Sequence, residues 1–465
     1  MQQNRRNLEK VSSRVAARLF RQARGGIDYA ALCRRGKNMP ESQDWYRLDT
    51  AAKIYPSISQ THNNTTFRLE LELDALVDKE KLQEALVKIM PRFPTFAVTL
   101  RRGMFWYYFE PNHALPIVKE ETGFPCKRLK DFINNGFLFN IMYYKKNVIM
   151  ECFHGLADGA GAIEFFKTLM YEYFKLCGYD MDAEGMVLDA EGKVPAYELE
   201  NSFNVYYDAK GTANKLRTPR AFHIMGNPNT DGGIFLTNGI IDLREFLAKV
   251  KAKGVTVSAY VSALLIACIA RDQGLEYKKD KRPIIISVPM DLRGMFPSHT
   301  LRNFISFANV GTVIDGEINF DRILEEVSNQ LKAGLSKESI SANINKNVGF
   351  EKNPFIRMTP LFVKNLVVSS SYKNYGEGSY TMVLSNLRTA QFPATMAAHI
   401  RQVYYALGVS DMNPMNCVVV SYQDKMVITF ARGIRETGIV RRFFEHFSKD
   451  LGMRVEIRGN EWSAQ

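Results

Sequence analysis

The chain has 465 residues, of which 46% are hydrophobic and 24% charged, and its formal net charge at pH 7 is +12. These proportions are those of a globular protein and exclude a disordered or fibrous one, and the length predicts two domains or two tightly packed halves. Residues 1–40 carry ten Lys and Arg against two acidic residues, a net charge of +8. The rest of the chain carries only +4, so we expect no nucleic-acid partner for the folded body.

The N-terminal extension, residues 1–40, is predicted to form a basic amphipathic helix. Its apolar face comprises Leu8, Val11, Val15 and Leu19, with Lys10, Arg14 and Arg21 to one side. Such a helix can lie on an anionic membrane, which makes residues 1–36 a candidate for peripheral membrane contact. A solvated helix, or one packed on a partner, is the favoured interpretation because few bulky aromatic side chains accompany it.

The chain shows no pattern of a secreted or membrane-spanning protein. The N-terminus carries charges where a signal peptide needs an apolar core, and the longest apolar stretch, "VSAYVSALLIACIA", is too short to span a bilayer. Six scattered cysteines form no CxxC pair and are predicted to be reduced core thiols. We therefore expect a cytoplasmic protein, with association at a membrane surface as an option.

Strands and helices alternate through the first half of the body, residues 41–182. A strand at 65–75 leads into a helix at 78–94, and hairpins are predicted at 95–112 and 137–154. Apolar residues at helical spacing predict a helix over 161–176 that ends at Gly178. Residues 183–231 mix charge, Gly and Pro with little periodicity and are the candidate crossover to the second half.

The second half, residues 232–465, repeats this alternation. Its predicted elements are strands at 232–242, 282–293, 304–315 and 380–387, helices at 243–254, 256–274, 320–336 and 439–452, and a hairpin at 416–433. The helix at 256–274 is almost entirely apolar and is expected to be buried. Both halves combine helices with hairpins, which predicts an α/β protein of two subdomains, each a mixed sheet with packed helices.

The segment "ECFHGLADGAGAIEFF", residues 151–166, carries the most specific signal for chemistry. His154 follows the second strand of a hairpin and stands just before a helix, whose positive end favours a neutral, basic imidazole at pH 7. Asp158 lies where a tight turn can fold it behind the loop, and Gly159 and Gly161 permit a close approach of backbone. His154 is therefore a candidate general base, and a histidine that only packs in a turn is the alternative.

The stretch "HGLADGAGAIEFFKTL" resembles the HxxxDG motif of the CoA-dependent acyltransferase superfamily, which includes chloramphenicol acetyltransferase, nonribosomal peptide condensation domains, plant BAHD acyltransferases and alcohol acetyltransferases. The order of "RFPTF", "GVTVSAYVSALLIACIA", "ISVPMDLRG" and "LSNL" extends the resemblance over most of residues 41–450. It implies two chloramphenicol-acetyltransferase-like subdomains with an active-site tunnel between them. The alcohol acetyltransferase-like and condensation-like branches are the nearest.

The resemblance also implies roles for individual residues. His154 is the base that deprotonates the acceptor, without a covalent acyl-enzyme, and Asp158 is a structural brace that pairs with Arg293. Asn386 in "LSNL" is a candidate oxyanion or acceptor contact, with a strand-end turn as the equally weighted alternative. Phe153 stands where condensation domains usually carry a further histidine, and no DFGWG motif of the BAHD branch is present.

The predicted activity is that of an alcohol O-acetyltransferase-like acyltransferase, which moves groups other than amino-acyl. The donor is acyl-CoA or an acyl carrier protein thioester, and the acceptor a small or lipophilic alcohol or amine. We expect no permanently bound cofactor, and the histidines show no metal-ligand spacing. The alternatives are a catalytically silent scaffold that binds a thioester or apolar ligand, and a stand-alone condensation enzyme. Residues 278–282, "KKDKR", could meet CoA phosphates, but a solvated loop is the favoured interpretation.

Overall fold

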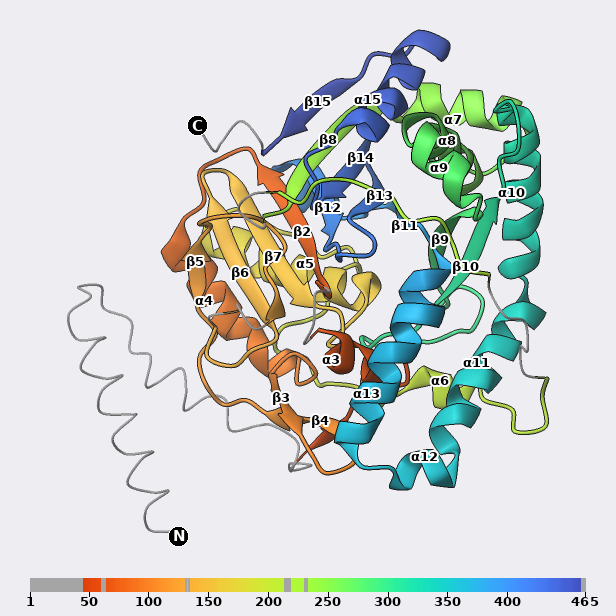
Figure 1. The fold of residues 1–465 in the computed structure, drawn as a ribbon. Helices are drawn as coiled ribbons and strands as arrows, with labels where there is room; N and C mark the ends of the chain where they lie inside the picture. Colours follow the sequence, from red (N-terminus) through yellow and green to blue (C-terminus); the bar gives the residue numbers. More distant parts are fainter. Residues whose placement is uncertain are drawn as a thin grey trace. The chain divides into compact units, whose positions relative to one another are not determined.

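A computed structural model gives the fold (Figure 1). It describes residues 45–59, 64–129, 132, 134–212, 219–229 and 233–460. The predicted N-terminal helix, and with it the candidate membrane contact of residues 1–36, lies outside these residues. Secondary structure over the described residues is mixed α/β, as predicted.

A five-stranded mixed sheet carries the first half of the body. Its strand order is β12 (Ile400–Leu407), β2 (Thr66–Leu73), β7 (Asn147–Phe153), β6 (Phe139–Tyr144) and β5 (Val118–Glu120). Neighbouring strands are antiparallel except for β5 and β6. The helices α4 (Lys79–Ile89) and α5 (Gly159–Leu176) pack against each other and share the hydrophobic core of this sheet. Because β12 comes from the second half of the chain, the two halves interleave.

A seven-stranded sheet carries the second half. Its order is β10 (Ile305–Thr312), β9 (Ile284–Asp291), β11 (Met382–Thr389), β13 (Met415–Tyr422), β14 (Lys425–Arg432), β8 (Phe235–Asp242) and β15 (Glu456–Gly459). The helices beside it are α7 (Leu243–Ala252), α8 (Val257–Asp272), α9 (Gly274–Asp280), α10 (Phe320–Gly334) and α15 (Gly438–Glu445) (Figure 1). A small third sheet joins β1 (Tyr46–Arg47), β4 (Tyr107–Pro111) and β3 (Val98–Arg102).

The apolar helix predicted at 256–274 is α8, and residues 259–270 of it are all buried. Its N-cap is Thr256, whose side chain accepts a hydrogen bond from the backbone of Ala259. Within the described part of the chain, no single helix is both long and apolar enough to cross a membrane. The pair α7 and α8 meets the length and composition together, but the two helices are bent by 84°.

The helices that the sequence did not predict include three that follow one another: α11 (Lys337–Lys352), α12 (Pro354–Met358) and α13 (Leu361–Ser371). They lie together at one end of the molecule in Figure 1, with β3 and β4 nearby. In α11 the buried apolar residues Ile340, Ile344 and Val348 recur at helical spacing, a stripe that the sequence prediction overlooked. No residue of α12 is buried, and α13 buries only Leu361 and Lys364, so neither has a regular apolar stripe. The cysteines Cys126, Cys152, Cys268 and Cys417 are buried free thiols.

Candidate active site

His154 stands directly after strand β7, at the end of the first sheet. Its backbone N–H donates to the carbonyl of Thr65 at 2.8 Å, which extends the pairing of β7 with β2 by one step. The ring of Tyr55 stacks on the imidazole at 4.7 Å between centroids, and Phe67 meets it edge-on at 5.2 Å. A strand end and two aromatic contacts therefore fix the ring, as a general base requires.

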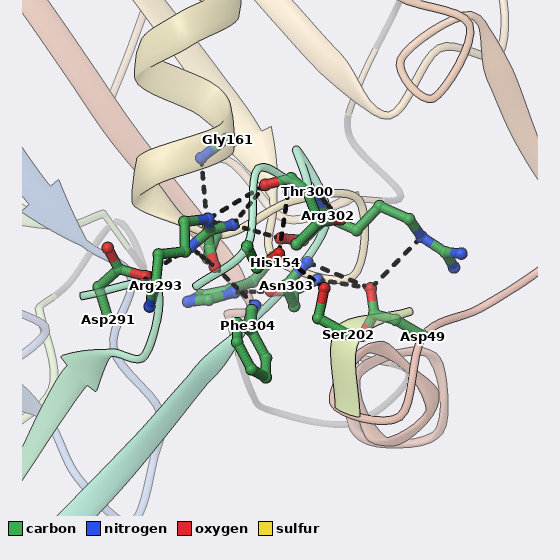
Figure 2. Close-up of polar contacts among 12 residues, drawn as sticks. Asp49, His154, Gly161, Ser202, Asp291, Arg293, Thr300, Arg302, Asn303 and Phe304 are labelled. Carbon is green, nitrogen blue, oxygen red and sulfur yellow. Dashed lines mark hydrogen bonds and ion pairs between the residues drawn. The ribbon is translucent and has the colours of Figure 1, made fainter. Parts of the chain in front are cut away.

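The Nδ1 atom of His154 faces Asn303. The Oδ1 atom of Asn303 lies 3.3 Å from Nδ1, and Asn303 Nδ2 donates to Asp49 Oδ2 at 3.2 Å (Figure 2). Because a carboxylate only accepts hydrogen bonds, Asp49 turns the NH₂ of Asn303 toward itself and the carbonyl oxygen toward the imidazole. His154 then carries its proton on Nδ1, which leaves the lone pair of Nε2 as the basic site.

Burial lowers the pKa of His154 below its ordinary value. A hydrogen bond to its own backbone, the charge of Asp158 and the amide of Asn303 oppose this effect only in part. The ring is therefore neutral at pH 7. Burial raises the pKa of Asp49, which is fully buried, while Arg302 and the N–H groups of Ala52 and Asn303 lower it.

Asp158 is 1% exposed and caps α5. Its Oδ1 accepts from Gly161 N at 2.9 Å, and its Oδ2 accepts from Phe304 N at 2.8 Å. Arg293 donates to both oxygens, at 2.9 Å and 3.1 Å, so the structure brings together the two residues expected to pair (Figure 2). Burial alone would lower the pKa of Arg293, but Asp158 and Asp291 raise it above its ordinary value.

The two glycines of the motif face different neighbours. A Cβ on Gly161 would lie 2.0 Å from the carbonyl oxygen of Leu301, so only glycine lets the loop of residues 293–304 cross the first turn of α5. A Cβ on Gly159 would lie 3.2 Å from the side chains of Leu387 and Tyr405 and is far less restricted. The expected close approach of another backbone segment therefore occurs at Gly161. Gly159 instead lies on the wall of the cavity described next.

A cavity of about 1040 Å³ opens between the two sheets. His154 lines it from the first sheet, together with residues of β2 and β12, while parts of β9, β11 and α10 and the start of α8 line it from the other side. The cavity wall includes the cations Lys167, Lys332 and Arg388. The predicted basic run 278–282 does not line it, and Arg282 there pairs with Asp280.

Asn386 lines the cavity, and both polar groups of its side chain are engaged. Nδ2 donates to Ser258 Oγ at 3.1 Å, and Oδ1 accepts from Arg388 N at 2.9 Å. The second bond holds Arg388 in the left-handed region, with φ at 59°. These contacts belong to an irregularity within β11, where the pairing with β13 shifts register between Asn386 and Thr389, rather than to a turn at the strand end. A contact of Asn386 with substrate stays a prediction.

Asn303 and Asp49 are site residues that sequence reasoning missed. Asn303 lies 149 residues from His154, and Asp49 precedes the first long strand, where no motif marks either residue. The sequence offered one signal for Asn303: it is a polar residue directly before the predicted strand at 304–315. Among the described side chains, no group of three or more His, Cys, Asp or Glu is arranged to hold a metal ion.

Several solved structures have a fold similar to that of this chain. TRI101 of F. graminearum, solved with coenzyme A and T-2 mycotoxin, matches with a TM-score of 0.58 at 12% identity, over 88% of this chain and 99% of that one. Polyketide synthase associated protein 5 from Mycobacterium tuberculosis matches with a TM-score of 0.54 at 13% identity, over 88% and 100%. The chain therefore has the same fold as these two proteins. The same fold appears in the starter condensation domain of rhizomide synthetase RzmA, solved with C8-CoA and Leu-SNAC, with a TM-score of 0.53 at 11% identity over 86% and 93%.

No protein-family model and no curated protein matches the sequence. The identities to the solved structures are so low that the likeness establishes the two-lobed acyltransferase fold alone. The chemistry therefore has to be argued from the residues of the site.

Proposed function

We propose that the protein is an acyltransferase that moves an acyl group from acyl-CoA, or from a carrier-protein thioester, to an alcohol or amine. The observation that carries the proposal is the orientation of His154, whose Nδ1 is held by Asn303 and Asp49 on the wall of a large cavity. This arrangement supplies a neutral imidazole with a basic Nε2. A filled or blocked cavity would favour a catalytically silent binding protein, and the cavity is open.

The reaction uses His154 twice. Nε2 removes the proton of the acceptor O–H or N–H while the acceptor atom attacks the thioester carbonyl, which forms a C–O or C–N bond and a tetrahedral intermediate. Collapse of the intermediate breaks the C–S bond, and the departing thiolate takes the proton from the imidazolium. The products are an ester or amide and free CoA thiol, and no acyl group is ever attached to the protein.

Asp158 and Arg293 act on this chemistry through structure. Asp158 ties the start of α5 to the loop of residues 293–304, and the same loop carries Asn303. Loss of the pair would displace Asn303 from His154 and so disturb the orientation of the base. Asp158 is therefore a positioning residue in this proposal.

The cavity wall suits the two substrates. Lys332 and Arg388 supply positive charge for the phosphates of CoA. Apolar side chains that include Ile54, Ile58 and Val403 line another part of the wall and suit a lipophilic acceptor. The acyl chain length and the acceptor are to be found by screening.

A free-thiol release assay with several acyl-CoAs against pooled alcohols and amines tests the proposal. We expect the wild type to release free CoA thiol only when an acceptor is present, and His154→Ala to lose this release. His399→Ala is the matched control, because His399 lies outside the cavity and bonds to Asp74. If His154→Ala releases thiol as fast as the wild type, His154 is not the general base. Binding of acyl-CoA in calorimetry without any release would favour the silent binding protein.

A further inference from the structure

Helix α13 is amphipathic in the inverse sense. Its inward side buries Leu361 but also polar groups: Lys364 is 7% exposed and donates to the carbonyl of Phe105 at 2.9 Å, and Asn365 donates to Tyr107 Oη at 3.0 Å. Its outward side is apolar, with Phe362 60% exposed and Leu366 72% exposed. A helix that packs on a core and faces water usually buries its apolar side chains and exposes its polar ones.

The apolar surface continues from α13 onto its neighbours. No residue of α12 is buried, and Phe355 and Met358 are 83% and 74% exposed. The β3–β4 turn adds Met104, which is 74% exposed and whose carbonyl accepts from the backbone of Leu361 at 2.8 Å. We call this surface the apolar face; it comprises Met104, Phe355, Met358, Phe362, Leu366 and Val367. An exposed apolar patch of this kind marks an interaction site.

Basic residues surround the apolar face. Residues 346–376 contain five Lys and Arg against one acidic residue, Glu351. Lys364 is buried, and the other four cations are exposed: Lys346, Lys352, Arg357 and Lys373. Glu351 is itself paired with Lys53, which leaves the segment with little negative charge to offer a partner. Strand β3 ends with Arg101 and Arg102, both exposed, of which Arg101 pairs with Glu110. We propose that the apolar face docks on the surface of an anionic lipid bilayer.

Lipid fits this face better than another protein does. Apolar side chains flanked by Lys and Arg are the composition of helices that lie in the membrane interface. A protein interface of similar size would carry a set of directional hydrogen bonds, yet the six side chains of the apolar face have no hydrogen-bonding group. Anionic headgroups match the net positive charge around the face.

The segment that follows α13 lines the cavity. Directly after α13, Tyr372 and Gly376 line the cavity, and Tyr375 does so while 70% exposed. A lipophilic acceptor could pass from the bilayer along this segment to the cavity. This step rests on the proposed function, whereas docking itself can be measured without any substrate.

Vesicle flotation with the full chain tests the docking. We expect binding to phosphatidylcholine vesicles that contain 30% phosphatidylserine, and roughly tenfold or greater loss of affinity in F362E/L366E. The matched control is L76E/L275E, which adds the same charges at Leu76 and Leu275, both exposed outside the apolar face. Thiol release with water-soluble substrates should stay unchanged in F362E/L366E, because neither residue lines the cavity.

A second pair of variants keeps the test independent of folding defects. In L366W the added tryptophan should be quenched by brominated phospholipid, whereas in L275W it should not. Absence of wild-type binding, binding that F362E/L366E retains, or an unquenched L366W on vesicles that do bind the chain would overturn the proposal. A dimer that is lost in F362E/L366E, without vesicle binding, would identify a second copy as the occupant and would also overturn it.

Discussion

The pair of Asp158 and Arg293 predicts a loss of stability in Asp158→Asn. The carboxylate of Asp158 accepts four N–H donors, from Gly161, Phe304 and twice from Arg293, at 2.8–3.1 Å. An amide in its place offers one oxygen, turns an NH₂ toward the remaining donors and leaves Arg293 without its buried counter-charge. Breaking such a pair costs about 3–5 kcal/mol. Arg293 keeps Asp291 at 2.6 Å, so we expect about 3 kcal/mol, the low end.

Urea unfolding of the wild type and of Asp158→Asn measures this loss as a shift of the midpoint. The matched variant is Arg293→Met, and the double variant completes a cycle that isolates the pair. The charge of Asp158 raises the pKa of His154, so its removal leaves the imidazole at least as neutral as before. A wild-type midpoint combined with complete loss of activity in Asp158→Asn would refute the structural role.

Three further predictions concern the base and the donor. Burial lowers the pKa of His154, so kcat/KM should stay high as the pH falls to 6.5 and decline only below it; a decline that begins above pH 7 would contradict this. Asp49→Ala removes the acceptor that orients Asn303, so kcat should fall, by less than the roughly 10²–10⁴-fold expected for loss of the base itself, while calorimetry shows unchanged acyl-CoA affinity; an unchanged kcat would contradict the relay. Lys332→Glu with Arg388→Glu should raise KM for acyl-CoA more than KM for the acceptor, and steady-state kinetics in which both constants rise equally would contradict the assignment.

The sequence predicted the elements that carry His154 because they are local. Strand β7, the turn and helix α5 follow one another within 30 residues, and their apolar spacing is regular. Arg293 could be expected only through the resemblance to a family, since nothing in the spacing of 135 residues ties it to Asp158. The domain boundaries predicted at residues 40, 182 and 231 stay a prediction. No pattern in the sequence indicated that β12 joins the first sheet.

The parts that were missed depend on long-range contacts. Asn303 acquires its role from Asp49, 254 residues away, through a hydrogen bond that no local pattern encodes. Helix α13 was missed because it buries Lys364 beside Leu361 and exposes Phe362, Leu366 and Val367, so its apolar residues do not follow the pattern of a helix that faces water. In both cases the chemistry of a side chain became informative only once its neighbour in space was known.

The central claim is that His154 deprotonates an acceptor that attacks an acyl thioester. The most direct measurement is acceptor-dependent release of free CoA thiol by the wild type and by His154→Ala, with His399→Ala as the control. The account predicts release by the wild type and the control, and a loss of roughly 10²–10⁴-fold in His154→Ala with acyl-CoA binding retained. Equal release by His154→Ala and the wild type would contradict it.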